Sequence, residues 1–104
     1  MPSKKKETNK VALFKIKGTL SVYEVGSLRD ELLGYLIEND GLKLDLSDVN
    51  ECDVAGIQFI LSAQRTFDIA GKQLTLCGVS QVIKETATRT GIDSENQVYH
   101  EKGV

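Results

Sequence analysis

The spacing of apolar residues along the chain switches repeatedly between the period of a strand and the period of a helix. Apolar and polar side chains alternate through residues 11–20, which is typical of a strand and predicts one that ends near Gly18. From Val25 to Leu36 the apolar positions recur every three or four residues, which predicts a helix with one apolar face. The run Asn39-Asp40-Gly41 has the turn chemistry that ends such a helix.

A second strand and a second helix follow in the same order. Leucines alternate with polar residues from Leu42 to Leu46, and Ser47-Asp48 interrupts that alternation. We therefore expect a strand that ends in a short acidic turn. Asp53 is suited to begin the next helix, because its carboxylate can accept hydrogen bonds from free first-turn amides. Gly71 is the residue expected to end that helix.

The last part of the chain predicts a third strand over residues 73–79 and a helix that begins at Ser80 and ends at Gly91. Residues 98–99 fit a short edge strand. Helices that connect successive strands favour parallel pairing, with the helices packed against the sheet. The pattern therefore predicts an α/β fold: one small domain with a mixed or mostly parallel sheet of four to five strands and helices on one side.

Composition narrows the class of protein. The chain has 104 residues, is 40% hydrophobic and carries a net charge of −2, which fits one globular domain and gives no basic excess for binding nucleic acid. No apolar run approaches the roughly 20 residues that cross a bilayer, so we expect no direct insertion into a membrane. We expect residues 1–10, which contain four lysines, to form a flexible basic arm before a domain over residues 11–104.

Cys52 and Cys77 have no spacing typical of metal ligands, and the single histidine, His100, lies far along the chain. Two thiols in a domain of this size suggest a reducing compartment, so we expect a cytoplasmic protein in which both act as small buried hydrophobes. We expect no metal and no cofactor. A thiol redox enzyme that uses the two cysteines stays open as an alternative, although the chain has no Cys-x-x-Cys pair.

Several short motifs resemble those of one known family. Leu44-Asp45-Leu46-Ser47-Asp48-Val49, Asp53-Val54-Ala55-Gly56-Ile57 and Thr90-Gly91-Ile92 stand in an order and spacing similar to a STAS domain, the domain of anti-sigma factor antagonists and of sulfate transporter tails. The likeness extends from Val11 to Ile92. It implies a small bacterial regulatory module that binds a protein partner, often a kinase-type anti-sigma factor, through the loop and helix start that contain Asp53.

In the switchable members of that family, the resemblance implies a serine at the helix start that the partner phosphorylates. Val54 stands at that position here and has no hydroxyl to accept a phosphoryl group. The charge that phosphorylation adds, about −1.5 to −2, is therefore unavailable at this site. We expect binding that is independent of phosphorylation there, through six residues: Asp53, Val54, Ala55, Gly56, Gln58 and Ser62. Ser21 and Ser47 stay open as other phosphorylation sites, and each also fits a turn residue.

Three classes of function follow from these observations. The first is a non-enzymatic regulatory module in a sigma-factor or chemotaxis-linked signalling pathway. The second is a cytoplasmic accessory subunit of an ABC (lipid) transport complex that contacts the transporter ATPase. The third is the thiol enzyme. We expect the first of these, with a protein as the partner.

Overall fold

The computed structural model describes residues 10–91, in which three strands alternate with three helices. This order confirms the alternation that the sequence predicts. In chain order the elements are β1 (Val11–Leu20), α2 (Val25–Glu38), β2 (Gly41–Cys52), α3 (Val54–Ile69), β3 (Gln73–Val79) and α4 (Gln81–Thr90).

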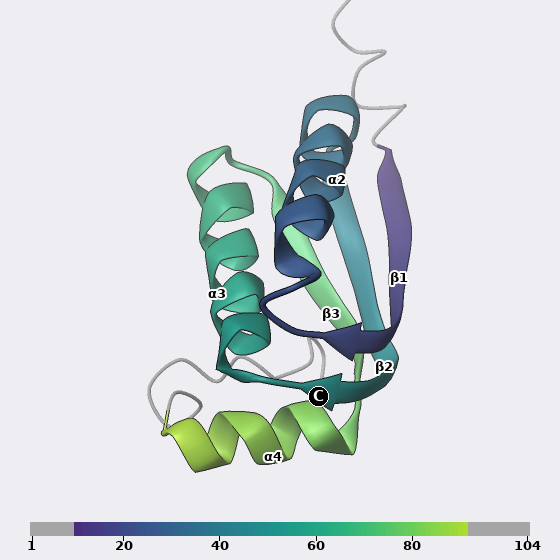
Figure 1. Cartoon of the computed structure of the whole chain (residues 1–104). Helices are drawn as coiled ribbons and strands as arrows, with labels where there is room; N and C mark the ends of the chain where they lie inside the picture. The colour runs from purple at the N-terminus through teal and green to yellow at the C-terminus, as the bar shows by residue number, and fades with distance from the viewer. Residues whose placement is uncertain (1–9, 92–104) are drawn as a thin grey trace, which may run out of the picture.

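The three strands are parallel and lie in the order β1-β2-β3, so β2 is the middle strand. Figure 1 shows α2 and α3 side by side against one face of the sheet, with α4 across the end where the strands finish. The predicted fold class is confirmed: a small α/β domain with a parallel sheet and helices packed against it. The described residues form three strands rather than the four to five expected, and the strand predicted at residues 98–99 lies outside them.

The hydrophobic core lies between the middle strand and the two covering helices. Leu42, Leu44 and Leu46 of β2 are fully or almost fully buried, and they meet Ile60 and Phe67 of α3 in one cluster. Each such side chain stabilises the fold by about 1.5–3 kcal/mol relative to an exposed one. The core therefore fixes α3 against the centre of the sheet, and with it the position where α3 begins.

The prediction of an acidic turn at Ser47-Asp48 is wrong, because β2 continues through these residues to Cys52. Two β2 residues occupy the space opposite one β1 residue between the pairs Lys15↔Asp45 and Lys17↔Asp48. This is a β-bulge, which bends a strand without ending it. The Ser47 amide donates to Asp45 Oδ1 at 3.0 Å and stabilises the irregular segment. A bulge and a turn both interrupt alternation, so the sequence pattern does not distinguish them.

The first strand is also longer than expected. It passes through Gly18, whose φ of 84° lies in the left-handed region that glycine readily adopts, and ends at Leu20. A second register shift falls between Gly18 and Thr19. The glycine therefore marks an irregularity within the strand, and the two extra residues carry Leu20 to the start of α3.

The helix ends agree with the sequence. Gly71 and Gly91 both have left-handed backbones, with φ of 75° and 78°, as expected of residues that follow a helix. Lys10, the last residue of the expected basic arm, bonds through its backbone to Asp40: its amide donates to Asp40 Oδ2 at 3.0 Å. Residues 1–9 of that arm lie outside the described residues. No helix within residues 10–91 has the length and apolar character needed to span a bilayer.

Candidate functional site

Asp53 joins the start of α3 to the loop between β1 and α2. Its Oδ1 accepts a hydrogen bond from the Gly56 amide at 3.0 Å, which confirms the predicted helix N-cap. Its Oδ2 accepts one from the Val22 amide at 3.2 Å. The Asp53 amide in turn donates to the Leu20 carbonyl at 3.3 Å. One carboxylate therefore caps α3 and also holds the neighbouring loop in place.

Gly56 allows α3 to lie directly against the end of β1. A Cβ atom added at this buried position would lie within 3.0 Å of the Leu20 carbonyl oxygen and 2.8 Å from Cys52 Sγ. The first of these atoms belongs to the backbone and cannot rotate away. Gly56 therefore supports the site through close packing, and it offers no side chain to a partner.

Three of the predicted binding residues line one hollow of about 370 Å³ between the starts of α2 and α3. These are Ala55, Gln58 and Ser62, and the hollow also contains Arg29 and Phe59. Val54 precedes Ala55 at the first position of α3 and is 48% exposed. The predicted set thus divides into surface residues and two supporting residues, Asp53 and Gly56.

Sequence reasoning missed the contribution of the loop between β1 and α2. Val22 and Tyr23 are 58% and 90% exposed, and the bond between the Val22 amide and Asp53 places this loop beside the start of α3. We call Val22, Tyr23 and Val54 together the apolar junction. The sequence signal for this contribution was the pair of adjacent apolar residues, Val22 and Tyr23, between a strand and a helix. Neither residue fits the apolar periodicity of the strand or of the helix.

The two alternative phosphorylation sites both bond to nearby carboxylates. The Ser21 hydroxyl donates to Glu24 Oε1 at 2.5 Å, and the Ser47 hydroxyl donates to Asp45 Oδ1 at 2.7 Å. A phosphate at either position would face an existing negative charge, which is unfavourable. Both serines therefore act as local bonding residues, which is the turn-type role that their sequence context also allowed.

The aspartates near the site have separate partners. Asp45 accepts from Ser47, and this bond, more than any other contact, lowers the pKa of the Asp45 carboxyl. Asp48 pairs with Lys15 at 3.0 Å, and Asp53 caps α3. Among residues 10–91, no three acidic, histidine or cysteine side chains gather where they could hold a metal. Their arrangement serves the strand bulge and the helix start.

The two cysteines differ from the prediction in part. Cys52 is a half-buried free thiol, and burial, followed by the nearby charge of Asp53, raises its pKa to about 11. Thiolate chemistry is therefore disfavoured at Cys52 near neutral pH. Cys77 is exposed on β3, so the expectation that it is buried is wrong. Strand alternation explains the exposure, because the neighbouring Leu76 faces the core.

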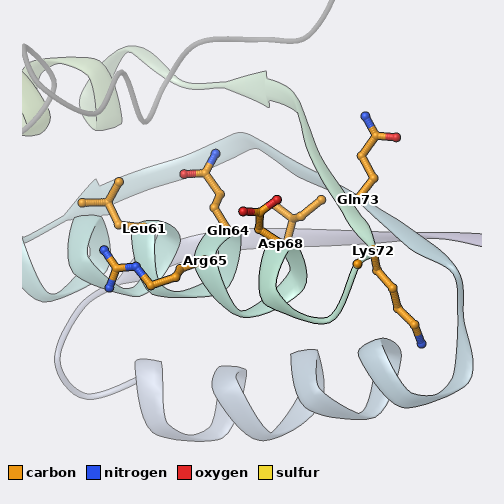
Figure 2. Close-up of a pocket in the computed structure, with 8 residues that line it drawn as sticks. Leu61, Gln64, Arg65, Asp68, Lys72 and Gln73 are labelled. Carbon is orange, nitrogen blue, oxygen red and sulfur yellow. The ribbon is translucent and has the colours of Figure 1, made fainter.

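A larger hollow of about 710 Å³ lies on the other side of α3, where the helix ends and β3 begins. Figure 2 shows Gln64 and Asp68 standing together there, whereas Lys72 points away toward α2. The Lys72 ammonium donates to the Leu36 carbonyl at 2.6 Å, at the end of α2. The Lys72 ammonium is therefore bonded outside this hollow. None of the predicted site residues lines the hollow.

Comparison with known proteins identifies the family. A family model described as "Mlab, STAS domain" matches residues 3–99. The chain belongs to the STAS domain family. This confirms the resemblance carried by the motifs around Asp53 and Gly91. STAS domains are generally regulatory interaction modules rather than catalysts. No match emerges among curated protein sequences.

Solved structures share the STAS fold at low identity. The anti-sigma factor antagonist SpoIIAA in its unphosphorylated form has a TM-score of 0.66 and 13% identity, with 84% of this chain and 77% of that chain covered. A sulfate transporter family protein from Wolinella succinogenes has a TM-score of 0.60 and 24% identity, with 82% of this chain and 70% of that chain covered. The STAS domain of a SulP transporter from Vibrio cholerae has a TM-score of 0.60 and 17% identity, with 83% of this chain and 67% of that chain covered. At these identities the likeness establishes the fold.

Proposed function

We propose that this STAS domain is a non-enzymatic bacterial regulatory module that acts in the cytoplasm by binding a protein partner at the start of α3. The observation that carries the proposal is the apolar junction: Val54 at the capped start of α3 is an exposed apolar side chain, and so are Val22 and Tyr23 in the loop that is bonded to the capping Asp53. Clustered exposed apolar residues on a small domain mark interaction sites more often than isolated ones do. Ala55, Gln58 and Ser62 extend the surface into the adjoining hollow.

The proposed binding is not switched by phosphorylation at Val54. The family resemblance assigns this position to the modified serine of switchable members, and valine cannot carry the phosphate that would separate the complex. The half-exposed Val54 side chain instead contributes apolar surface that a partner can bury. A sigma-factor or chemotaxis-linked signalling component is the partner class we favour.

The experiment compares two valine-to-aspartate variants by affinity purification of the tagged protein from its native cells, with quantitative mass spectrometry of the bound proteins. Val54→Asp places a charge in the apolar junction. It leaves the helix stable, because the first turn of α3 has no acidic residue and a negative charge there is favourable by about 0.3–1 kcal/mol. Val11→Asp is the matched control, because Val11 is similarly exposed (54%) but lies on β1, away from the junction.

We expect the wild type and Val11→Asp to retain the same partner and Val54→Asp to lose it. Unfolding midpoints measured by circular dichroism establish that both variants are folded. A folded Val54→Asp protein that keeps the partner at wild-type yield contradicts the proposed site.

The fold likeness to transporter domains supports a second candidate, an accessory subunit of a transport complex. In that case the same surface would contact the transporter ATPase. The purification separates the two candidates, because the enriched protein is either a signalling component or a subunit of a transporter.

A further inference from the structure

A groove runs along the surface between α2 and α3. The hollow of about 370 Å³ at the helix starts adjoins a second one of about 240 Å³ farther along, and the two share Arg29, Phe59 and Ser62. Leu33 and Thr66 line the second hollow. We call these five residues and the space between them the α2–α3 groove. Figure 1 shows the two helices lying side by side along their length.

Exposed apolar side chains follow the groove-lining residues along both helices. Leu33 and Ile37, one turn apart on α2, are 38% and 77% exposed, and Ile69, two turns after Ser62 on α3, is 80% exposed. The apolar junction lies at the other end. Of the eight large exposed apolar side chains among the described residues, these two groups account for six. Among the described residues, exposed apolar side chains are therefore concentrated on α2, α3 and the loop before α2, which indicates an interaction surface.

Arg29 is the single charged residue that lines either hollow. No described residue forms an ion pair or hydrogen bond with its guanidinium. The residues three and four positions away on α2 are all apolar or glycine, so no acidic side chain on the same helix face is available to pair with it. Arg29 is exposed, and a guanidinium is a strong binding group for a carboxylate.

The shape of the groove favours a protein segment over a small molecule. Small-molecule sites are concave and enclose most of the ligand, whereas these two hollows adjoin each other along the surface between two helices. A row of shallow hollows between two helices instead suits the successive apolar side chains of a third helix, which anchor at spacings of three, four and seven residues. The lining residues extend from Val25 to Leu33 on α2 and from Ala55 to Phe67 on α3, which is about 12 Å and about 18 Å of helix.

We propose that the α2–α3 groove accepts an amphipathic helix of the partner, with its apolar face against Leu33, Ile37 and Ile69 and an acidic residue paired with Arg29. The inference rests on the proposed function for the existence of a protein partner and adds the element that the partner supplies. It also accounts for the position of the apolar junction, which lies where one end of such a helix would emerge.

The test uses a displayed library of amphipathic peptides of about 18 residues, roughly five helical turns, in which the positions flanking a fixed apolar stripe are randomised. Peptides selected on the wild-type protein are measured by fluorescence anisotropy. We expect selected peptides to carry aspartate or glutamate beside the stripe. We expect Arg29→Glu to weaken their binding by about tenfold or more, and replacement of the peptide carboxylate by lysine to restore it.

Two variants locate the binding. Leu33→Glu should abolish it, because a charge would enter the apolar wall of the groove. Lys84→Glu makes the same charge reversal on α4, where Lys84 lines a separate hollow, and should bind like the wild type. Circular dichroism establishes that each variant is folded.

Three outcomes overturn the inference: no peptide is selected, the selected peptides show no acidic preference, or they bind Arg29→Glu and Leu33→Glu as well as the wild type. Sedimentation showing a dimer that Leu33→Glu dissociates would assign the groove to a second copy and would also overturn it. Because the peptides replace the native partner, these results are independent of whether Val54→Asp loses that partner in cells.

Discussion

Replacing Gly56 by alanine tests the close contact between the start of α3 and the end of β1. The added methyl group would lie within 3.0 Å of the Leu20 carbonyl oxygen, 2.8 Å from Cys52 Sγ and 3.0 Å from Leu20 Cγ. A side chain could rotate away, but the carbonyl belongs to a paired strand. We therefore expect Gly56→Ala to displace the first turn of α3 from the sheet and to lower the free energy of unfolding.

The magnitude follows from two opposing effects. Overpacking a tight site costs about 1–3 kcal/mol, and the backbone contact places Gly56 in the upper part of that range. Alanine is favoured over glycine within a helix by about 1 kcal/mol. The net destabilisation is therefore about 1–2 kcal/mol. For a domain of this size, each kcal/mol shifts the thermal midpoint by about 4–8 °C, so the midpoint should fall by at least about 4 °C.

Gly34 provides the matched control. It lies within α2, and a Cβ there meets no atom within 4 Å, so Gly34→Ala keeps the gain in helix propensity without the clash. We expect this variant to be more stable by up to about 1 kcal/mol. Thermal and urea unfolding followed by circular dichroism measure both changes. A Gly56→Ala protein as stable as the wild type, alongside a stabilised Gly34→Ala protein, would refute the close-contact argument.

Three further substitutions or treatments test the support of the site. Asp53→Ala should destabilise the fold by about 1–2 kcal/mol in urea unfolding, because it removes the cap of α3 and the bond to the neighbouring loop; an unchanged midpoint would contradict that role. Alkylation of Cys52 in the folded protein should be about 100-fold slower at pH 8 than for a thiol with the ordinary pKa of 9.0, because the raised pKa of about 11 keeps it protonated; equal rates in native and urea-unfolded protein would argue against this. Thr86→Val should cost about 1 kcal/mol, because the buried hydroxyl donates its one proton to the Val82 carbonyl at 2.7 Å, with the Cys52 carbonyl of β2 at 3.3 Å; unaltered unfolding would show that the hydroxyl adds nothing to stability.

Apolar periodicity was sufficient to predict the order of elements. The change from a period of two to one of three or four is a local property, and so are the glycines that end α3 and α4. The length of β2 was not predictable in this way. Its bulge at Leu46 and Ser47 depends on the register against β1, and the space beside Asp45 depends on Gly78 of β3, where a Cβ would lie 2.8 Å from Asp45 Oδ1. Contacts between strands that are distant in sequence decide both the register and the space around Asp45.

The local structure of the candidate site was predictable where its residues are close in sequence. The Asp53 cap follows from local chemistry, and the family motif drew attention to the residues after it. Val22, Tyr23 and Arg29 were not predicted, because they reach the site from another part of the chain. Their placement depends on a long-range hydrogen bond between Val22 and Asp53 and on the packing of α2 beside α3. Neither the hydrogen bond nor the helix packing produces a periodic pattern in the sequence.

The start of α3 separates the residues that hold the fold from those that remain available to a partner. Asp53 and Gly56 are engaged with the end of β1 and the following loop, so substitutions there alter the position of the helix itself. Val54 lies between them in sequence but keeps about half of its side chain exposed. If a change at Gly56 abolished partner binding, displacement of α3 and loss of a direct contact with the partner could not be told apart. Loss after a change at Val54, at an unfolding midpoint that is not lowered, isolates the contact, because the cap and the close packing beneath it stay intact.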